Sequence, residues 1–365
     1  MIPFVDLKAQ YRELRGEIDT AIAGVLEHGG FILGPEVLEM ERALAEFAGT
    51  RHCVAVASGT EALLISLMAL GIGAQDEVIV PAFTFAATAE VVVLVGATPV
   101  LVDIEPDTCN IDPAAISAAV TRRTKAIMPV SLYGQPSDMD EISAIARLHE
   151  IPVIEDGAQS FGAEYKRGRS CALSMIGCTS FFPSKPLGCY GDGGALFTDD
   201  QAIAQAAREI RVHGQSGRYH HTRIGLGGRM DTLQCAIVLA KLKRFEWELG
   251  RRLEIGARYN ALFDARGIQR VVQRTDRTSV FGQYTVFVDD REKVQRALSE
   301  AGIPSAVHYP APLSQQPAYR GICAHGPLPQ SENAARRVLS LPMHPYLEEA
   351  LQYRIVDALA SGVER

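Results

Sequence analysis

The chain has 365 residues, of which 47% are hydrophobic and 22% are charged. These values are typical of a soluble globular protein with a substantial core, and the length predicts two domains, or one large domain with an appendage. The 36 basic and 43 acidic residues give a formal net charge of −7. This mildly acidic balance argues against a nucleic-acid-binding protein, because such proteins carry a basic patch.

The seven cysteines are scattered and include no C-x-x-C pair, so neither a zinc site nor a disulfide framework is indicated. Reduced thiols favour a cytoplasmic location. The first residues, MIPFVDLKAQYREL, lack the layout of a signal peptide. The most apolar run, residues 86–104, contains Glu90, Gly96 and Pro99, which argues against a membrane span. We therefore expect no bound metal, no nucleic acid and no membrane partner.

Between residues 50 and 200, short β-branched runs alternate with helical patterns. Strands are expected, in chain order, at 52–58, 77–83, 98–104, 124–133, 151–158, 178–183 and 194–200. Helices are expected between them at 60–71 and 86–97, and from about Pro113 and Asp138. Runs that are apolar on both faces and separated by helices are typical of a mostly parallel sheet covered on both sides.

After residue 201 the pattern changes to long helices, at 201–211 and from 230 through 246 and beyond. A smaller unit follows, with a strand at 280–290, a helix at 291–302, a strand at 303–310 and a helix near 347–360. The sequence thus predicts a large α/β domain over residues 16–245 and a small C-terminal α/β domain over 246–365. Residues 1–15 are expected to pack against the small domain.

Ser58, Gly59 and Thr60 close one predicted strand and open a helix. Free backbone N–H groups and the positive end of the helix dipole face outward there, which favours a phosphate site to which Thr60 adds a hydroxyl donor. The alternative is an ordinary threonine N-cap.

Asp156 ends a hydrophobic strand and therefore lies at the carboxyl edge of the predicted sheet. A buried carboxylate needs a partner, and a protonated ring nitrogen would supply one. Gln159 follows within a turn and can donate to a neighbouring ring oxygen. The alternative for Asp156 is a structural residue that caps the next helix.

Lys185 lies in a loop among Phe181, Phe182 and Pro183. Desolvation favours the amine form of such a lysine and makes it a nucleophile toward aldehydes. The alternative is a surface lysine on a flexible loop. A phosphate seat, a buried carboxylate and an activated lysine together describe a site for pyridoxal phosphate.

Five motifs, at residues 58–63, 81–85, 153–163, 180–195 and 228–234, together resemble the sugar aminotransferases of the DegT/DnrJ/EryC1/StrS family. The likeness extends through nearly the whole chain, from GPEVLEMERALAEF near the start to HYPAPL near the end. The resemblance implies the fold type I architecture of pyridoxal-phosphate-dependent transferases. It also implies a homodimer or dimer of dimers with an active site shared between subunits.

The resemblance also assigns roles to individual residues. Lys185 is expected to hold the cofactor covalently and to be the catalytic residue. Asp156 is expected to pair with the protonated ring nitrogen, and Gln159 to contact the phenolic oxygen. The other residues expected at the cofactor are Gly59, Thr60 and Ser180 at its phosphate and Phe85 stacked on its ring. For Phe85 the alternative is an ordinary core position.

One position departs from the family pattern. Gly227 stands where the family usually has an asparagine that reaches across the dimer to the partner's cofactor phosphate. A glycine offers only its backbone, so one hydrogen bond, worth about 1 kcal/mol, is in doubt.

Within the family, the chain most resembles aminotransferases that act on UDP-2-acetamido-2-deoxy-3-oxo-D-glucuronic acid with L-glutamate as donor. The resemblance implies a role in making bacterial surface polysaccharides such as O-antigen. Arg229, His308 and Tyr309 are the residues expected at the sugar, and Arg229 can fork onto a carboxylate. For Arg229 the alternative is a structural ion pair.

Three other functions are alternatives to this one. A family member acting on a 4-keto-6-deoxy nucleotide sugar would need no site for a carboxylate. A dehydratase of the family would carry histidine at position 185, which the sequence rejects. A non-catalytic regulator could keep the fold without the cofactor, but the intact pair of Asp156 and Lys185 argues against it. Metal binding at His220 and His221 is disfavoured because adjacent side chains point apart, and His344 is expected to cap or pack.

Overall fold

The computed structural model describes residues 2–166 and 168–364. Residues 167 and 365, which fall within the predicted domain ranges, and residue 1, which belongs to the N-terminal segment 1–15, lie outside the described part. The central sheet consists of two hydrogen-bonded halves, β13-β3-β2-β4 and β1-β9-β8-β5. Parallel bridges from Ile127 to Val153 and from Val130 to Asp156 join the halves. The strands of this sheet are β1 (His52–Val56), β2 (Glu77–Pro81), β3 (Thr98–Val102), β4 (Thr124–Ile127), β5 (Ile154–Asp156), β8 (Ile176–Ser180), β9 (Gly194–Thr198) and β13 (Ala324–His325).

The sheet is parallel except at β9, which runs antiparallel to both of its neighbours, β1 and β8. The prediction of an α/β fold with a mostly parallel sheet is therefore confirmed. Each expected strand between residues 50 and 200 is present but shorter than expected. β4 shows the largest difference, because regular pairing ends at Ile127 and Val130 makes only a single bridge, to Asp156, before the short 3₁₀ turn η1 (Leu132–Gly134).

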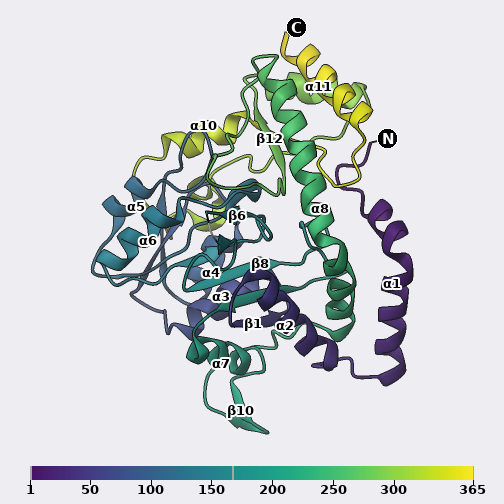
Figure 1. Cartoon of the computed structure of the whole chain (residues 1–365). Helices are drawn as coiled ribbons and strands as arrows, with labels where there is room; N and C mark the ends of the chain where they lie inside the picture. Colours follow the sequence, from purple (N-terminus) through teal and green to yellow (C-terminus); the bar gives the residue numbers. More distant parts are fainter. Residues whose placement is uncertain (1, 167, 365) are drawn as a thin grey trace.

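Alternate residues of each strand face opposite helical layers, as a sheet covered on both sides requires. In β1, Val54 and Val56 pack in the core beneath α3, α4 and α7, whereas Cys53 and Ala55 pack in the core beneath α2 and α8. The helices of the large unit are α1 (Leu7–His28), α2 (Pro35–Ala48), α3 (Gly59–Ala69), α4 (Ala87–Leu94), α5 (Pro113–Ala119), α6 (Met139–Leu148) and α7 (Gln201–Ile210). Figure 1 shows these helices around the sheet, with α7 at the lower end.

A single helix, α8 (Thr232–Asp264), connects the large unit with the C-terminal unit. Its first half packs on α1 and α2, and its second half buries Ile255, Tyr259 and Phe263 in a separate core (Figure 1). That core is completed by β12 (Tyr284–Phe287), α9 (Arg291–Glu300), β14 (Val338–Leu341) and α11 (Glu349–Glu364). The predicted boundary near residue 245 lies inside α8, so the division into two domains stays a prediction.

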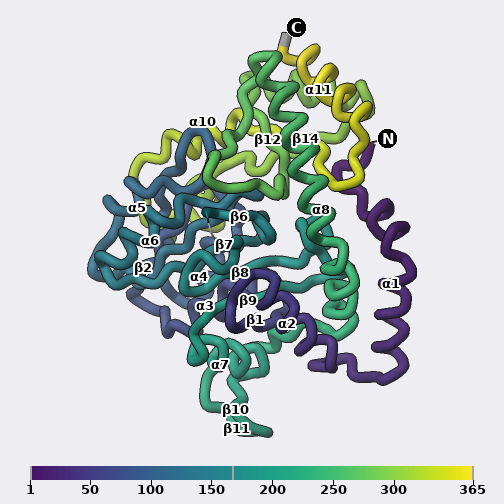
Figure 2. Tube along the Cα trace, viewed as in Figure 1, coloured from purple at the N-terminus to yellow at the C-terminus, as the bar shows by residue number. Residues whose placement is uncertain are grey.

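The N-terminal segment approaches the C-terminal unit. Ile2 belongs to the core of that unit, and the Phe4 carbonyl accepts from the Met343 N–H at 3.2 Å. Figure 2 shows the start of the chain beside the yellow C-terminal segment. Residues 2 and 4 thus contact the C-terminal unit, and the packing of residues 1–15 against a small domain stays a prediction.

The strand expected at 303–310 does not form. This segment makes one bridge, from Ala306 to Ser340, and β12 pairs instead with β14 in antiparallel register. Proline supplies no N–H for a ladder, and Pro304 and Pro310 interrupt this run. The segment instead carries His308 and Tyr309 toward the sheet edge.

The remaining elements are short or peripheral. They are β6 (Glu164–Tyr165), β7 (Gly168–Arg169), β10 (Gln215–Gly217), β11 (His220–His221), η2 (Leu313–Gln315), η3 (Pro317–Tyr319) and α10 (Pro329–Arg337). Within residues 2–166 and 168–364, no helix combines the length and the apolar character that crossing a bilayer requires.

His344 packs in the interior with 3% of its surface exposed, as expected for a packing histidine. Burial lowers its pKa to about 4, with Asp6 opposing and Arg252 reinforcing the shift. The unfolded chain therefore binds the proton more tightly than the folded one. The neutral ring stabilises the fold fully above the ordinary pKa of 6.5, and this contribution is lost as the pH falls from 6.5 toward 4.

We expect the His344→Gln variant to be less sensitive to acid than the wild type. Because each pKa unit is worth about 1.4 kcal/mol, wild type should lose about 2 kcal/mol more than the variant by pH 5. Urea unfolding at pH 7.5, 6 and 5, at fixed protein concentration, measures the difference. Equal losses in the two proteins would contradict this role of His344.

Candidate active site

A cavity of about 400 Å³ opens at the carboxyl edge of the sheet. It is lined by the start of α3, the segment after β2, the end of β5, the lysine loop after β8 and the 303–310 segment. Segments that are far apart in the sequence therefore meet here. The predicted site residues that line the cavity are Gly59, Thr60, Phe85, Asp156, Gln159, Ser180, Lys185, His308 and Tyr309.

Asp156 ends β5 with 6% of its surface exposed. Its Oδ1 accepts from the Ala158 N–H at 3.1 Å, and its Oδ2 accepts from the Thr88 hydroxyl at 3.0 Å. Burial raises the pKa of this carboxyl, while the two hydrogen bonds and the charge of Lys185 oppose the rise. No helix directly follows β5, so Asp156 caps a turn and not a helix, and its pairing with a ring nitrogen stays a prediction. Both of its hydrogen-bond partners are neutral, so a cationic ring nitrogen would complete its environment.

Lys185 is half-buried in the loop between β8 and β9. Its backbone N–H donates to the Phe182 carbonyl at 2.9 Å, and the buried Lys241 of α8 anchors the same loop by donating to the Gly188 carbonyl at 2.6 Å. Burial lowers the pKa of Lys185, and the charge of Asp156 opposes this. A lowered pKa increases the fraction of the unprotonated amine, which is the nucleophilic form. The loop is held in place, which argues against a freely mobile surface lysine.

The phosphate site predicted from the sequence lies where α3 begins. Ser58, not Thr60, is the N-cap of this helix, since its hydroxyl accepts from the Glu61 N–H at 3.1 Å. Thr60 is thus inside the first turn and lines the cavity, and the N-cap alternative for it is wrong. An added Cβ on Gly59 would lie 2.7 Å from the Ser180 Cβ. Glycine therefore lets α3 and β8 approach closely and leaves the helix N-terminus open to an anion.

We expect Gly59→Ala to weaken cofactor binding roughly tenfold or more, because the methyl group displaces either α3 or Ser180 at a cost of about 1–3 kcal/mol. Titration of the apo-protein with pyridoxal phosphate measures this. Gly24→Ala is the matched control, since a Cβ at that helical position meets nothing within 4 Å. Equal affinity of the two variants would contradict the close approach.

Gln159 links the cavity to a neighbouring turn. Its Oε1 accepts from the Tyr133 N–H at 2.8 Å, and its Nε2 donates to the Tyr309 hydroxyl at 3.1 Å. The Tyr133 hydroxyl donates to the His308 carbonyl. Tyr133 therefore holds both Gln159 and the 303–310 segment, and nothing in the sequence pattern singled it out.

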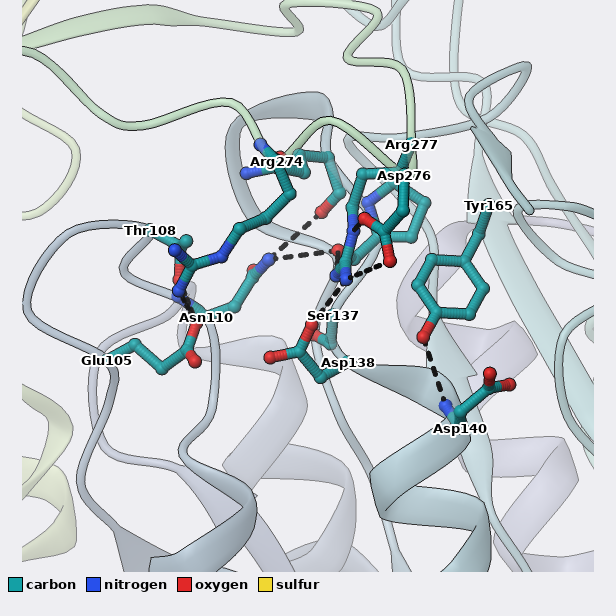
Figure 3. A network of polar contacts seen from close by, with 12 residues as sticks. Glu105, Thr108, Asn110, Ser137, Asp138, Asp140, Tyr165, Arg274, Asp276 and Arg277 are labelled. Atoms are coloured by element: carbon teal, nitrogen blue, oxygen red, sulfur yellow. Dashed lines mark hydrogen bonds and ion pairs between the residues drawn. The ribbon is translucent and has the colours of Figure 1, made fainter.

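A polar network fixes the turn that carries Tyr133. Asn110 accepts from the Leu132 N–H at 2.9 Å and donates to the Gln135 carbonyl at 3.2 Å. Arg277 donates to the Pro136 carbonyl at 2.9 Å and pairs with Asp138 and Asp276 (Figure 3). These contacts bind the turn to the chain that enters the C-terminal unit, and they keep Tyr133 in position.

Two predicted residues do not line the cavity of their own chain. Gly227 is exposed and bridges to Val212. Arg229 is half-buried. Burial raises the pKa of Glu61, and the charge of Arg229 opposes this rise. The role predicted for Gly227 depended on a second subunit, and the roles of both residues stay predictions.

The two phenylalanines of the segment after β2 differ in their exposure to solvent. Phe83 is 1% exposed, whereas Phe85 is 57% exposed and lines the cavity. The core alternative for Phe85 is therefore wrong.

His220 and His221 lie on an exposed hairpin, where the ring nitrogens contact Ser216 and the His213 carbonyl respectively.

Sequence reasoning missed several cavity residues. Thr88, Asp192 and Gln283 were not predicted, although Thr88 bonds Asp156 directly and the other two line the cavity. A hydroxyl in a run at 86–95 whose only other polar side chain is Glu90 was the available signal for Thr88.

Comparison with known proteins decides the family. A model of the DegT/DnrJ/EryC1/StrS aminotransferase family matches residues 12–360. The chain belongs to this family. The resemblance inferred from the sequence motifs is thus confirmed, and the protein is an aminotransferase of the nucleotide-sugar type.

Individual relatives agree with this assignment. A Pseudomonas aeruginosa protein named UDP-2-acetamido-2-deoxy-3-oxo-D-glucuronate aminotransferase is 56% identical over 361 residues, which cover 99% of this chain and 100% of the relative. The crystal structure of DesV from S. venezuelae with a ketimine intermediate has a TM-score of 0.97 and 41% identity, covering 100% and 99% of the two chains. The structure of NtdA from Bacillus subtilis with bound cofactor PMP has a TM-score of 0.89 and 31% identity, covering 97% and 82%.

The cofactor is pyridoxal 5′-phosphate. The residues at the cavity fit this cofactor. The cavity is lined by a buried carboxylate with neutral partners, a half-buried lysine, and a glycine at the N-terminus of a helix. When bound, the cofactor supplies an aldehyde that a primary amine attacks and a ring that withdraws electrons from the attached group.

Proposed function

We propose that this protein transfers the amino group of L-glutamate to the 3-keto group of UDP-2-acetamido-2-deoxy-3-oxo-D-glucuronic acid. The observation that carries the proposal is the meeting of Lys185 and Asp156 in one cavity. The 56% identity to the Pseudomonas aeruginosa enzyme of that name supports the substrate. The product would serve the synthesis of bacterial surface polysaccharide, such as the O-antigen of lipopolysaccharide, and the enzyme would act in the cytoplasm.

Each residue of the cavity has its own role in this reaction. The Lys185 amine attaches the cofactor and, when free, moves a proton as general base and acid. Asp156 keeps the ring nitrogen protonated, and Gln159 lies within reach of the ring oxygen. Ser180, Thr60 and the N–H groups at the start of α3 bind the phosphate, and Phe85 covers the ring. Because two substrates use one site in turn, ping-pong kinetics is expected.

The sugar would bind toward the 303–310 segment. His308 and Tyr309 line the cavity there, and Arg229 would supply the cation for the uronic carboxylate. Since Arg229 does not line its own cavity, this role requires a contribution from a second subunit.

A homodimer is therefore part of the proposal. Exposed apolar residues include Phe31, Ile32 and Leu33 after α1, and Phe85 and Phe182 at the cavity mouth. An association that covers these groups would close the cavity and bring in the partner's loop around Gly227. Mixing inactive Lys185→Ala chains with inactive Arg229→Ala chains tests the sharing. Hybrid dimers should regain one active site, whereas no recovery would argue against it.

The substrate is tested by measuring turnover of purified holoenzyme with L-glutamate and each of two keto sugars. The 3-keto uronic acid should be aminated, and the 4-keto-6-deoxy sugar should not. Turnover of only the 4-keto compound would support the alternative within the family. Absence of turnover with both, together with failure to bind pyridoxal phosphate, would support a regulator that keeps the fold.

A further inference from the structure

Gln159 and Tyr309 share one hydrogen bond whose direction is fixed by a third residue. The Tyr133 backbone N–H donates to the Gln159 Oε1 at 2.8 Å. Because a backbone N–H can only donate, this atom of the Gln159 amide must be the oxygen. The other amide atom is therefore the NH₂ group, and it donates to the Tyr309 hydroxyl at 3.1 Å. The geometry thus excludes the flipped orientation of the amide.

The turn that carries Tyr133 is held in place by its neighbours. Tyr133 has a φ of 57° and a ψ of 4°, a left-handed conformation that a bulky residue keeps only where its surroundings hold it. The Leu132 N–H donates to the Asn110 side chain at 2.9 Å, and the Tyr133 hydroxyl donates to the His308 carbonyl. Gln159, the acceptor of the Tyr133 N–H, is 4% exposed. A fixed donor therefore meets a buried amide, and the orientation of that amide is set.

The Tyr309 hydroxyl keeps its own proton for another partner. Its oxygen accepts from Gln159, and within residues 2–166 and 168–364 the hydroxyl makes no other hydrogen bond. Burial raises the pKa of Tyr309, the charge of Asp156 adds to this rise, and the hydrogen bond from Gln159 opposes it. The phenol is therefore protonated at neutral pH. Because Tyr309 lines the cavity, its O–H is free to donate to a molecule bound there.

We propose that Tyr309 is a hydrogen-bond donor of the active site, directed by Gln159, and that its acceptor is an oxygen atom of the bound ligand. Two sources supply such an oxygen, namely a carbonyl or carboxylate group of the sugar nucleotide and the phenolic group of the cofactor ring. For this bond Gln159 is a positioning residue, and its second N–H is left for the ring oxygen. The identity of the sugar rests on the proposed function, whereas the direction of the hydrogen bond does not.

The direction of the bond determines which groups Tyr309 recognises. A donor binds a keto, amide-carbonyl or carboxylate oxygen, and it leaves an N–H group of the ligand without a partner. The proposed substrate carries all three kinds of acceptor. A ligand that places an apolar group against Tyr309 would leave the O–H unpaired and would bind less well.

Neutron diffraction from crystals of deuterated holoenzyme, without any sugar, tests the direction. Two deuterons should lie on the Gln159 Nε2, with one of them directed at the Tyr309 oxygen, and the Tyr309 deuteron should point away from Gln159. Since no sugar is present, failure of the proposed substrate would leave this result intact. A Tyr309 deuteron directed at Gln159, or a Tyr309 without its deuteron, would overturn the proposal.

Tyr309→Phe removes only the hydroxyl and identifies the acceptor. If the acceptor belongs to the sugar, kcat/KM for the keto sugar should fall roughly two- to tenfold, as the loss of one hydrogen bond predicts. The affinity for pyridoxal phosphate and the absorption band of the holoenzyme should then stay unchanged. If the acceptor is the ring oxygen, that affinity should fall by a similar factor and the band should shift. No change in kcat/KM, affinity or absorption would overturn the proposal.

Tyr259→Phe is the matched control. Tyr259 is buried in the core of the C-terminal unit, where its hydroxyl donates to the Pro342 carbonyl at 3.1 Å. This variant also loses one phenolic hydrogen bond, so its stability should fall, but its kcat/KM and cofactor affinity should match those of the wild type. Equal losses of kcat/KM in Tyr259→Phe and Tyr309→Phe would show that the Tyr309 hydroxyl acts through stability alone, and the proposal would fail.

Discussion

Lys185→Ala is expected to lower the turnover of the keto sugar by at least about 10³-fold. The reason is that one primary amine both attaches the cofactor and moves the proton, and general acid–base catalysis alone contributes about 10²–10⁴-fold. The measurement is steady-state turnover, together with borohydride reduction of the wild-type holoenzyme and peptide mapping. The reduced cofactor should be found on the peptide that contains Lys185.

Two controls make this prediction specific. Lys185→Arg keeps a cation of similar length but cannot attack an aldehyde, so it should be as inactive as Lys185→Ala. Lys241 is also buried, and burial lowers its pKa to about 8, but it donates to the Gly188 carbonyl instead of facing the cavity. An adduct on Lys241, or no adduct at all, would contradict the proposed site.

Asp156→Asn is expected to weaken cofactor binding by roughly 10²- to 10⁴-fold, corresponding to the loss of about 3–5 kcal/mol when one partner of a buried ion pair is removed. The neutral amide no longer favours a protonated ring nitrogen, so kcat should fall as well. Fluorescence titration of the apo-protein gives the affinity, and turnover at saturating cofactor gives kcat.

Glu155→Gln makes the same chemical change one residue earlier. Glu155 is completely buried, but its carboxylate accepts from the hydroxyls of Ser131 and Ser170 and from the Cys171 N–H. This variant should lose stability and keep most of its cofactor affinity. If both variants lost affinity equally, the specific pairing of Asp156 with the ring would not hold.

The sequence predicted the elements that carry the cofactor because their signals are local. The alternation of β-branched runs and helical patterns gave the parallel sheet, and the ends of its strands gave Asp156 and the start of α3. Lys185 was recognisable because a lysine among aromatic and glycine residues is unusual. The strand predicted at 303–310 was wrong, because its apolar residues favour a strand whereas its prolines interrupt a ladder.

What the sequence determined by itself was the family, the fold class and nine of the residues that line the cavity. These depend on short motifs and on strand ends, which are encoded within a few residues. Only the tertiary structure placed the Tyr133 hydroxyl against the His308 carbonyl, and the Ser340 hydroxyl, which contacts that of Thr285, against the His308 ring. Their hydrogen bonds join residues up to 175 positions apart, and no local pattern encodes such a contact. The pairing of β12 with β14 and the packing of the Tyr133 turn against the C-terminal unit produce these contacts.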